Sequence, residues 1–127
     1  AKSGLSSDQM EKYTSQLRSL MDSDRVFLES DLTMNKLASL VKCSVNHLSQ
    51  AVNSGFGMSF FDFLHSYRIE EAKTLLCSSD LHSKAVLDVS FAVGFNSNSA
   101  FYAAFKKATG QTPAQYRRSF LATLSTH

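Results

Sequence analysis

The sequence contains only one proline and five glycines in 127 residues, and it has no tryptophan. Proline and glycine are the residues that most often interrupt regular structure, so their scarcity favours helices joined by short turns. No segment alternates β-branched or aromatic residues with polar ones over the length of a strand, and no apolar run approaches the roughly 20 residues that cross a bilayer. We therefore expect an all-α chain without a membrane-spanning segment.

The chain is also poor in the residues that build metal sites and active sites. Its two cysteines, Cys43 and Cys77, are 34 residues apart, and its four histidines show no metal-ligand spacing. In the absence of a signal-peptide pattern, two unpaired thiols indicate a reducing cytosol, so we expect a cytoplasmic location. Neither cysteine has a nearby base in a catalytic arrangement that the sequence can show. We expect no metal, no cofactor and no enzymatic activity.

Acidic residues are missing from the last third of the chain. The formal net charge is only +2, from 13 basic and 11 acidic residues. From residue 89 to residue 127 there is no acid, whereas four basic residues occur there: Lys106, Lys107, Arg117 and Arg118. Such a stretch is typical of a phosphate-binding surface, and it also fits solvated helix faces that happen to lack acids. The sequence alone leaves both interpretations open.

One helical pattern occurs twice, at residues 37–52 and 89–105. Each copy has a short apolar helix, a tight turn, a Ser or Asn cap and a second helix whose outer face is polar and almost uncharged. This order is typical of a helix-turn-helix motif. Ala38 and Ser90 are 52 residues apart, whereas Leu48 and Phe101 are 53 apart. The second motif should therefore have one extra residue in its turn.

The repeat predicts seven helices, with two helix-turn-helix subdomains joined by a long linker helix. Ten phenylalanines and an apolar content of 43% supply enough core for one domain or two very small ones. We expect an N-terminal helix and docking loop (residues 1–31), a first helix-turn-helix (32–58), a linker helix (59–78), and a second helix-turn-helix with a C-terminal helix (79–127). Together these parts would form one DNA-binding domain.

The first motif carries specific expectations about its two helices. We expect Thr33 to cap the start of the first helix, in which Leu37, Leu40 and Val41 should point inward. Glycines at positions 55 and 57 should end the second helix. The polar break that follows the linker helix is expected at residues 79–83.

The second helix of each motif shows a face suited to double-stranded DNA. Amide and hydroxyl side chains both donate to and accept from base edges in the major groove, and the N-terminus of a helix binds phosphate. The expected base contacts are Asn46, His47, Ser49, Gln50 and Asn53 in the first motif, and Asn98, Ser99 and Tyr102 in the second. The expected phosphate contacts are Ser44, Ser97, Lys106 and Lys107.

The expected length of the linker helix is close to one helical turn of DNA. About 20 residues at about 1.5 Å each give about 30 Å. The major groove returns to one face of DNA every 34 Å or so. We therefore expect one monomeric chain to place its two recognition helices in successive turns of the major groove.

Four segments together resemble the DNA-binding domain of the AraC/XylS family of bacterial transcription regulators: residues 68–76, 93–95, 99–107 and 110–118. The resemblance extends from about residue 32 to residue 118. It implies the seven-helix domain described above, with base contacts at Asn46, Ser49 and Gln50 and around Asn98, Ser99 and Tyr102. Many relatives carry Arg at the position of Ala103, so the second motif of this chain has less capacity to read bases.

The resemblance also implies partners. Family members usually activate transcription through RNA polymerase, and most carry a separate sensing or dimerising domain, which we expect to be missing from this chain. Residues 25–53 resemble the subgroup in which this domain closes a longer regulator, sometimes a membrane-anchored one. A short stand-alone activator is the alternative architecture. The competing function is a helical protein-interaction module without specific DNA readout, with the phenylalanines of residues 56–63 as a partner groove rather than core.

Overall fold

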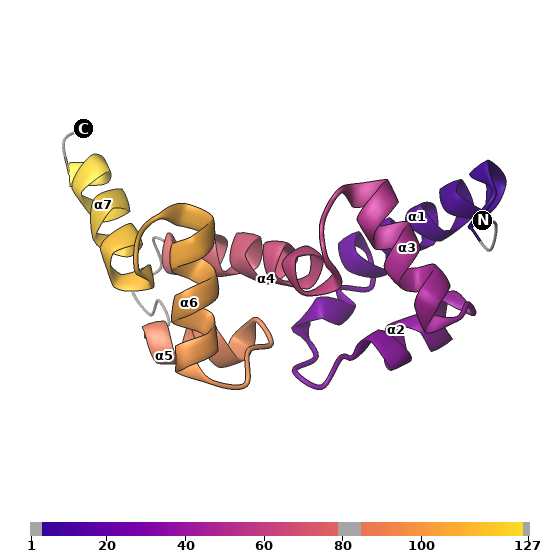
Figure 1. The fold of residues 1–127 in the computed structure, drawn as a ribbon. Helices are drawn as coiled ribbons and strands as arrows, with labels where there is room; N and C mark the ends of the chain where they lie inside the picture. The colour runs from indigo at the N-terminus through magenta and orange to yellow at the C-terminus, as the bar shows by residue number, and fades with distance from the viewer. Residues whose placement is uncertain (1–3, 79–84, 126–127) are drawn as a thin grey trace. The chain divides into compact units, whose positions relative to one another are not determined.

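A computed structural model describes residues 4–78 and 85–125. Within these ranges there are seven α-helices, one short 3₁₀ helix and no strand (Figure 1). The all-α prediction with seven helices is confirmed. The chain divides into two compact units, Ala1–Leu64 and His65–His127, and the boundary between them falls inside the helix α4 (Phe60–Leu76). The expected polar break at residues 79–83 lies outside the described residues.

The first unit contains α1 (Ser7–Asp22), the 3₁₀ helix η1 (Val26–Leu28), α2 (Met34–Val41), α3 (Val45–Phe56) and the start of α4. Side-chain caps fix where its helices begin. The Ser6 and Thr33 hydroxyls accept backbone N–H groups of α1 and α2, and the Ser59 hydroxyl does the same for α4. These bonds satisfy donors that a helix leaves unpaired in its first turn.

The core of the first unit is built from one face of each helix. Its members are fully or almost fully buried apolar side chains: Leu17, Met21, Phe27, Leu37, Val41, Leu48, Val52 and Phe63. Phe56 packs on Phe63, with ring centroids 4.6 Å apart. Most phenylalanines between residues 56 and 63 therefore belong to the core and not to a partner groove. Phe61 is the exception, since it is 65% exposed.

The second unit contains the rest of α4, together with α5 (Val86–Ala92), α6 (Asn98–Thr109) and α7 (Pro113–Ser125). A chain of aromatic rings forms its centre. The Phe101 ring lies 5.3 Å from that of Phe95 and 5.7 Å from that of Phe105, and Tyr116 of α7 packs edge-on against Phe105 at 5.3 Å. Such edge-to-face contacts add to the stabilisation that burial alone provides.

Two detailed expectations about the first motif are wrong. Leu40 is 50% exposed, because α2 is only eight residues long and its buried stripe is limited to Leu37, Ala38 and Val41. Gly55 does not end α3 but lies inside it, and the helix continues to Phe56 before Gly57 takes the left-handed conformation at its C-cap. Of the two glycines expected to end the helix, only Gly57 does so.

Within the described ranges, none of the helices has the length and hydropathy that spanning a membrane requires.

Candidate nucleic-acid interface

The turn of the first motif closes α2 with two backbone hydrogen bonds. The Lys42 N–H donates to the Ser39 carbonyl at 3.2 Å, and the Cys43 N–H donates to the Ala38 carbonyl at 3.0 Å. This pair of bonds is the Schellman arrangement, which requires a left-handed residue just after the helix. Lys42 supplies it, with φ of 65°. These bonds pair the Ala38 and Ser39 carbonyls while the chain reverses into α3.

The turn of the second motif repeats this arrangement at the end of α5. The Gly94 N–H donates to the Phe91 carbonyl and the Phe95 N–H to the Ser90 carbonyl, both at 3.1 Å. Gly94 has φ of 103° and stands 52 positions after Lys42. The caps of α3 and α6 are 53 positions apart, so the extra residue is Asn96, between Phe95 and the cap of α6. The predicted insertion in the second turn is confirmed.

Phe95 of the second turn packs against α4. Its ring is buried, with the His65 ring centroid at 5.3 Å, the Phe101 ring at 5.3 Å and the Arg68 guanidinium carbon at 5.6 Å. Arg68 is itself buried, and this burial lowers the pKa of its guanidinium from the ordinary value. An arginine over an aromatic face gains cation–π attraction. No local sequence pattern predicts this contact, because its members come from α4, α6 and the second turn, which are separate in the sequence.

The outer face of α3 is polar and carries no charged side chain. Leu48, Ala51 and Val52 are fully buried, which turns the opposite side of the helix toward solvent. The five expected base contacts divide by exposure: Asn46 and Asn53 are exposed, whereas His47, Ser49 and Gln50 are half-buried. The Asn53 amide donates to the Ser49 hydroxyl at 3.4 Å. All five lie on the one helix, within two and a half turns.

The outer face of α6 differs from that of α3 in its charge. Phe101 and Phe105 are fully buried, and the residues expected to touch DNA are all exposed: Asn98, Ser99, Tyr102, Lys106 and Lys107. The two lysines occupy the last turn of α6, where a positive charge also complements the helix dipole. Ala103, exposed between the polar residues, offers only a methyl group. The cationic part of the face therefore lies at one end of the helix.

Ser44 and Ser97 cap the two candidate recognition helices in the same way. The Ser44 hydroxyl oxygen accepts the His47 N–H at 3.0 Å, and the Ser97 hydroxyl oxygen accepts the Ala100 N–H at 3.1 Å. Each oxygen is occupied as an acceptor, but each hydroxyl hydrogen still allows donation to an anion. The caps thus leave both serines suitable as phosphate contacts.

Arg117 does not belong to the exposed cationic surface. Its Nε donates to the Leu76 carbonyl at 3.0 Å, so this side chain ties α7 to the last residue of α4. The Thr112 and Gln115 side chains accept each other's backbone N–H groups at the start of α7, with distances of 3.2 Å and 2.9 Å. Of the four basic residues after position 88, Lys106, Lys107 and Arg118 are exposed.

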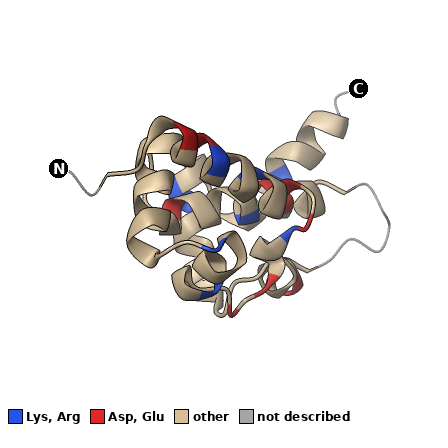
Figure 2. Ribbon diagram, turned by 90° about the vertical axis from the view of Figure 1, so that its right-hand side faces the viewer, with Lys and Arg blue, Asp and Glu red and all other residues tan. Residues whose placement is uncertain are grey.

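Overall charge says little about the partner. Most of the ribbon is uncharged, since only 19% of the residues are Asp, Glu, Lys or Arg (Figure 2).

Among the described residues, no group of three or more His, Cys, Asp and Glu is arranged to hold a metal ion. Burial raises the pKa of both the Cys43 and the Cys77 thiols, so neither is an activated nucleophile near pH 7.

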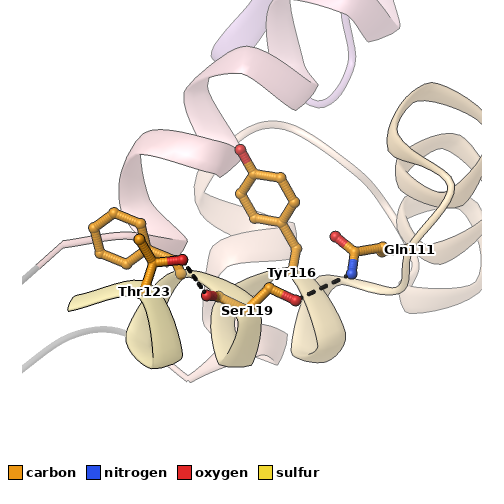
Figure 3. Close-up of a pocket in the computed structure, with 5 residues that line it drawn as sticks. Gln111, Tyr116, Ser119 and Thr123 are labelled. Atoms are coloured by element: carbon orange, nitrogen blue, oxygen red, sulfur yellow. Dashed lines mark hydrogen bonds between the residues drawn. The ribbon is translucent and has the colours of Figure 1, made fainter. Parts of the chain in front are cut away.

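A small cleft in the second unit is lined by Gln111, Tyr116, Ser119, Phe120 and Thr123 (Figure 3). The Gln111 amide donates to the Ser119 hydroxyl at 3.2 Å across it, and the Thr123 hydroxyl donates to the Ser119 carbonyl at 3.0 Å. The volume is about 190 Å³. Small-molecule pockets usually enclose about 300–1,000 Å³. This cleft therefore gives no support to a cofactor site.

Two short helix pairs, each closed by the same turn and each showing a polar outer face, define a helix-turn-helix protein. A family model described as a helix-turn-helix domain matches residues 37–119, which is more than half of the chain. The chain belongs to this family and is an AraC-type DNA-binding domain of a transcription regulator. Such domains are not enzymes, which confirms the expectation that this chain catalyses no reaction.

Similar sequences occur in much longer regulators. A helix-turn-helix-type transcriptional regulator of Staphylococcus aureus is 38% identical over 87 residues, which are 68% of this chain and 11% of that protein. The regulator YtdP of Bacillus subtilis is 33% identical over 90 residues, 71% of this chain and 11% of that protein. The chain thus matches about a tenth of the length of these relatives.

Solved structures share the fold. The C-terminal domain of AraT, a response regulator from Geobacillus stearothermophilus, has a TM-score of 0.70 and 34% identity, covering 81% of this chain and 83% of that domain. The C-terminal domain of the response regulator yesN from Fusobacterium nucleatum has a TM-score of 0.68 and 30% identity, covering 80% and 97%. The DNA-binding domain of AdpA, solved in complex with a target DNA, has a TM-score of 0.75 and covers 88% of this chain and 95% of that domain. Because the sequence identity is 23%, this similarity supports a shared fold only.

Proposed function

We propose that the chain binds duplex DNA sequence-specifically, with α3 and α6 as its recognition helices. The observation that carries this proposal is that each helix buries its apolar side completely and shows solvent a row of amide and hydroxyl groups. In α3 the amides and hydroxyls belong to Asn46, Ser49, Gln50 and Asn53, with the His47 imidazole on the same helix, and in α6 they belong to Asn98, Ser99 and Tyr102. A helix of this kind fits the major groove, and Gln or Asn pairs bidentately with adenine.

The two helices would contribute unequally. The α3 face has no cation, so its affinity for DNA must come from hydrogen bonds to bases and from its N-terminus. The α6 face has Lys106 and Lys107 at one end and the methyl group of Ala103 near its middle. Lysine contacts to phosphate give affinity without sequence preference. We therefore assign most base discrimination to α3 and most backbone anchoring to α6.

The helix caps support the phosphate-binding part of the proposal. The first backbone N–H groups of a helix have no intrahelical acceptor, and a serine cap takes only some of them. The remaining groups after Ser44 and Ser97, with the serine hydroxyls, would bind one phosphate at each helix. We further propose that a monomer reads two half-sites in successive major grooves. In support of this, the α4 helix has 17 residues, which corresponds to about 25 Å.

The remaining parts of the proposal concern the longer protein. We propose that the domain works in the bacterial cytoplasm, that it activates transcription through RNA polymerase, and that a sensing or dimerising domain controls it. The relatives support the part of this proposal that concerns a longer regulator, because they are transcriptional regulators and the matched segment is 11% of their length.

A matched pair of variants tests the assignment of roles. Gln50→Ala should lose about 1–3 kcal/mol of discrimination at one base pair of a selected site, leaving other base pairs unaffected. Lys106→Ala should weaken all sequences similarly and flatten the dependence of log K on log salt by about one unit. If Gln50→Ala leaves every base preference unchanged, α3 is not the reading helix.

A protein-interaction module remains the second candidate, and one observation favours it. Leu87 and Phe91 of α5 are 48% and 54% exposed and stand one helical turn apart. Two large exposed apolar side chains at this spacing suit a partner helix. The salt dependence of binding distinguishes the two functions. Affinity for DNA falls steeply as the salt concentration rises, whereas affinity for an apolar partner does not.

A further inference from the structure

The segment that leads into α1 lies beside the proposed reading face of α3. A β-carbon built on Gly4 would stand 3.3 Å from the Nε2 atom of Gln50, closer than ordinary van der Waals contact. Gln50 is half-buried, although it lies on the outer side of α3 with the exposed Asn46 and Asn53. A side chain at position 4 would therefore press on the Gln50 amide, which would have to shift by a few tenths of an ångström.

Close packing of α1 on α3 holds this segment in place. A β-carbon on Gly55 of α3 would lie 2.4 Å from Cγ2 of Thr14, a distance that real side chains essentially never show. Thr14 is buried on α1, and its hydroxyl donates to the Glu11 carbonyl at 3.1 Å. The two helices approach so closely that only glycine fits at position 55, and the position of α1 on α3 is fixed accordingly.

A capping box then fixes the direction in which the chain meets α1. The Ser6 hydroxyl accepts the Gln9 N–H at 3.1 Å, and the Ser6 N–H donates to the Gln9 Oε1 at 3.1 Å. Capping boxes of this kind restrict the residues immediately before a helix. Gly4 stands only two positions before this cap, and it lies next to Gln50.

We infer that Gly4 is a positioning residue for base readout, because the absence of a side chain there lets the Gln50 amide adopt the orientation in which it reads DNA. This inference rests on the proposed function of α3. It assigns a specificity-determining role to a residue outside both helix-turn-helix motifs. It also means that α1 and the segment before it contribute to the specificity of base recognition.

The test measures base preference at each position of a selected duplex site for Gly4→Ala and Gly4→Val. Valine is branched at Cβ, so it places extra atoms near Gln50 in every rotamer. A bidentate contact to one base pair is equivalent to about 5- to 150-fold discrimination. We expect the preference at the Gln50 base pair to fall about twofold with Ala and about fivefold or more with Val, whereas other positions keep theirs.

Two further variants separate this role from general damage. Ser15→Val adds the same side chain at an exposed position of α1 and should leave every preference unchanged. In a Gln50→Ala background, Gly4→Val should have no further effect, since the group it displaces is gone. Thermal unfolding of each variant confirms that it is folded.

The outcomes are distinguishable. If the unaltered chain selects no site, or if Gln50→Ala changes no preference, the proposed function of α3 fails. If Gln50→Ala changes the preference at one base pair but folded Gly4→Val does not, the function stands and the inference is overturned. A uniform loss of affinity with Gly4→Val at all base pairs also overturns it, because it indicates steric obstruction of DNA rather than positioning of Gln50.

Discussion

Lys42 and Gly94 occupy the same position in the turns of the two helix-turn-helix motifs, and both have a left-handed backbone, with φ of 65° and 103°. Each donates the same backbone hydrogen bond that closes the preceding helix. Only Gly94 is the residue type that adopts this conformation without a steric penalty. The first motif therefore carries conformational strain that the second does not.

This difference predicts opposite effects of substitution. Lys42→Gly should raise the free energy of unfolding by about 0.5–1 kcal/mol, because relief of the left-handed strain exceeds the entropy that glycine adds to the unfolded chain. Gly94→Ala should lower it by about 1–2 kcal/mol. Urea unfolding measures both. Lys42→Ala is the control, since it removes the charge but keeps the β-carbon, and stabilisation by that variant would show that strain is not the cause.

Ser90 predicts a second stability difference. It is fully buried, it stands where the first motif has Ala38, and its hydroxyl has no hydrogen-bond partner among the described residues. An unpaired buried hydroxyl costs free energy, so Ser90→Ala should stabilise the chain by about 1 kcal/mol. Ser97→Ala, the same change at the cap of α6, should destabilise by about 1 kcal/mol. Calorimetry should show melting temperatures that move in opposite directions, and a loss of stability in both would contradict this explanation for Ser90.

Gly55 tests the close approach of α1 and α3. In an open helix, replacing glycine by alanine stabilises by about 1 kcal/mol. Here the added methyl group would meet Cγ2 of Thr14, so Gly55→Ala should instead destabilise by about 1–3 kcal/mol. Thr14→Ser removes that methyl group while keeping the hydroxyl, and the double variant should recover most of the loss. Additive effects in the double-mutant cycle would rule out the contact as the cause.

Arg117 and Arg118 are adjacent in sequence but predict different phenotypes. Arg117 donates to the Leu76 carbonyl, so Arg117→Ala should cost about 1.5–2 kcal/mol of stability. Arg118 is exposed, and Arg118→Ala should change stability by less than about 0.5 kcal/mol. Chemical denaturation of the two variants gives the comparison directly. Equal losses would mean that the bond to α4 contributes nothing measurable.

Much of this fold follows from short-range sequence features. The caps at Thr33, Ser44 and Ser97 and the extra residue of the second turn are all local, and the sequence predicted each of them. Leu40 was predicted wrongly because the width of a buried stripe depends on how many neighbours a short helix has, and periodicity does not contain that information.

Features that depend on distant residues were missed. Gly55 is required by a threonine of α1, Arg117 binds a carbonyl 41 positions earlier, and Arg68 packs on a phenylalanine from the second turn. Their partners are defined only by tertiary structure. For the candidate interface, the sequence identified which residues face outward, whereas the influence of Gly4 on Gln50 appears only when α1 is placed against α3.

The most direct test of the whole account is selection of binding sites by this chain from a random duplex library. Two recognition helices in successive major grooves predict a non-palindromic site with two half-sites whose centres are about one helical turn, or about 10 base pairs, apart. The half-site read by α3 should be the more strongly specified of the two. A single half-site would contradict base reading by α6, and recovery of no preferred sequence would contradict the proposed function as a whole.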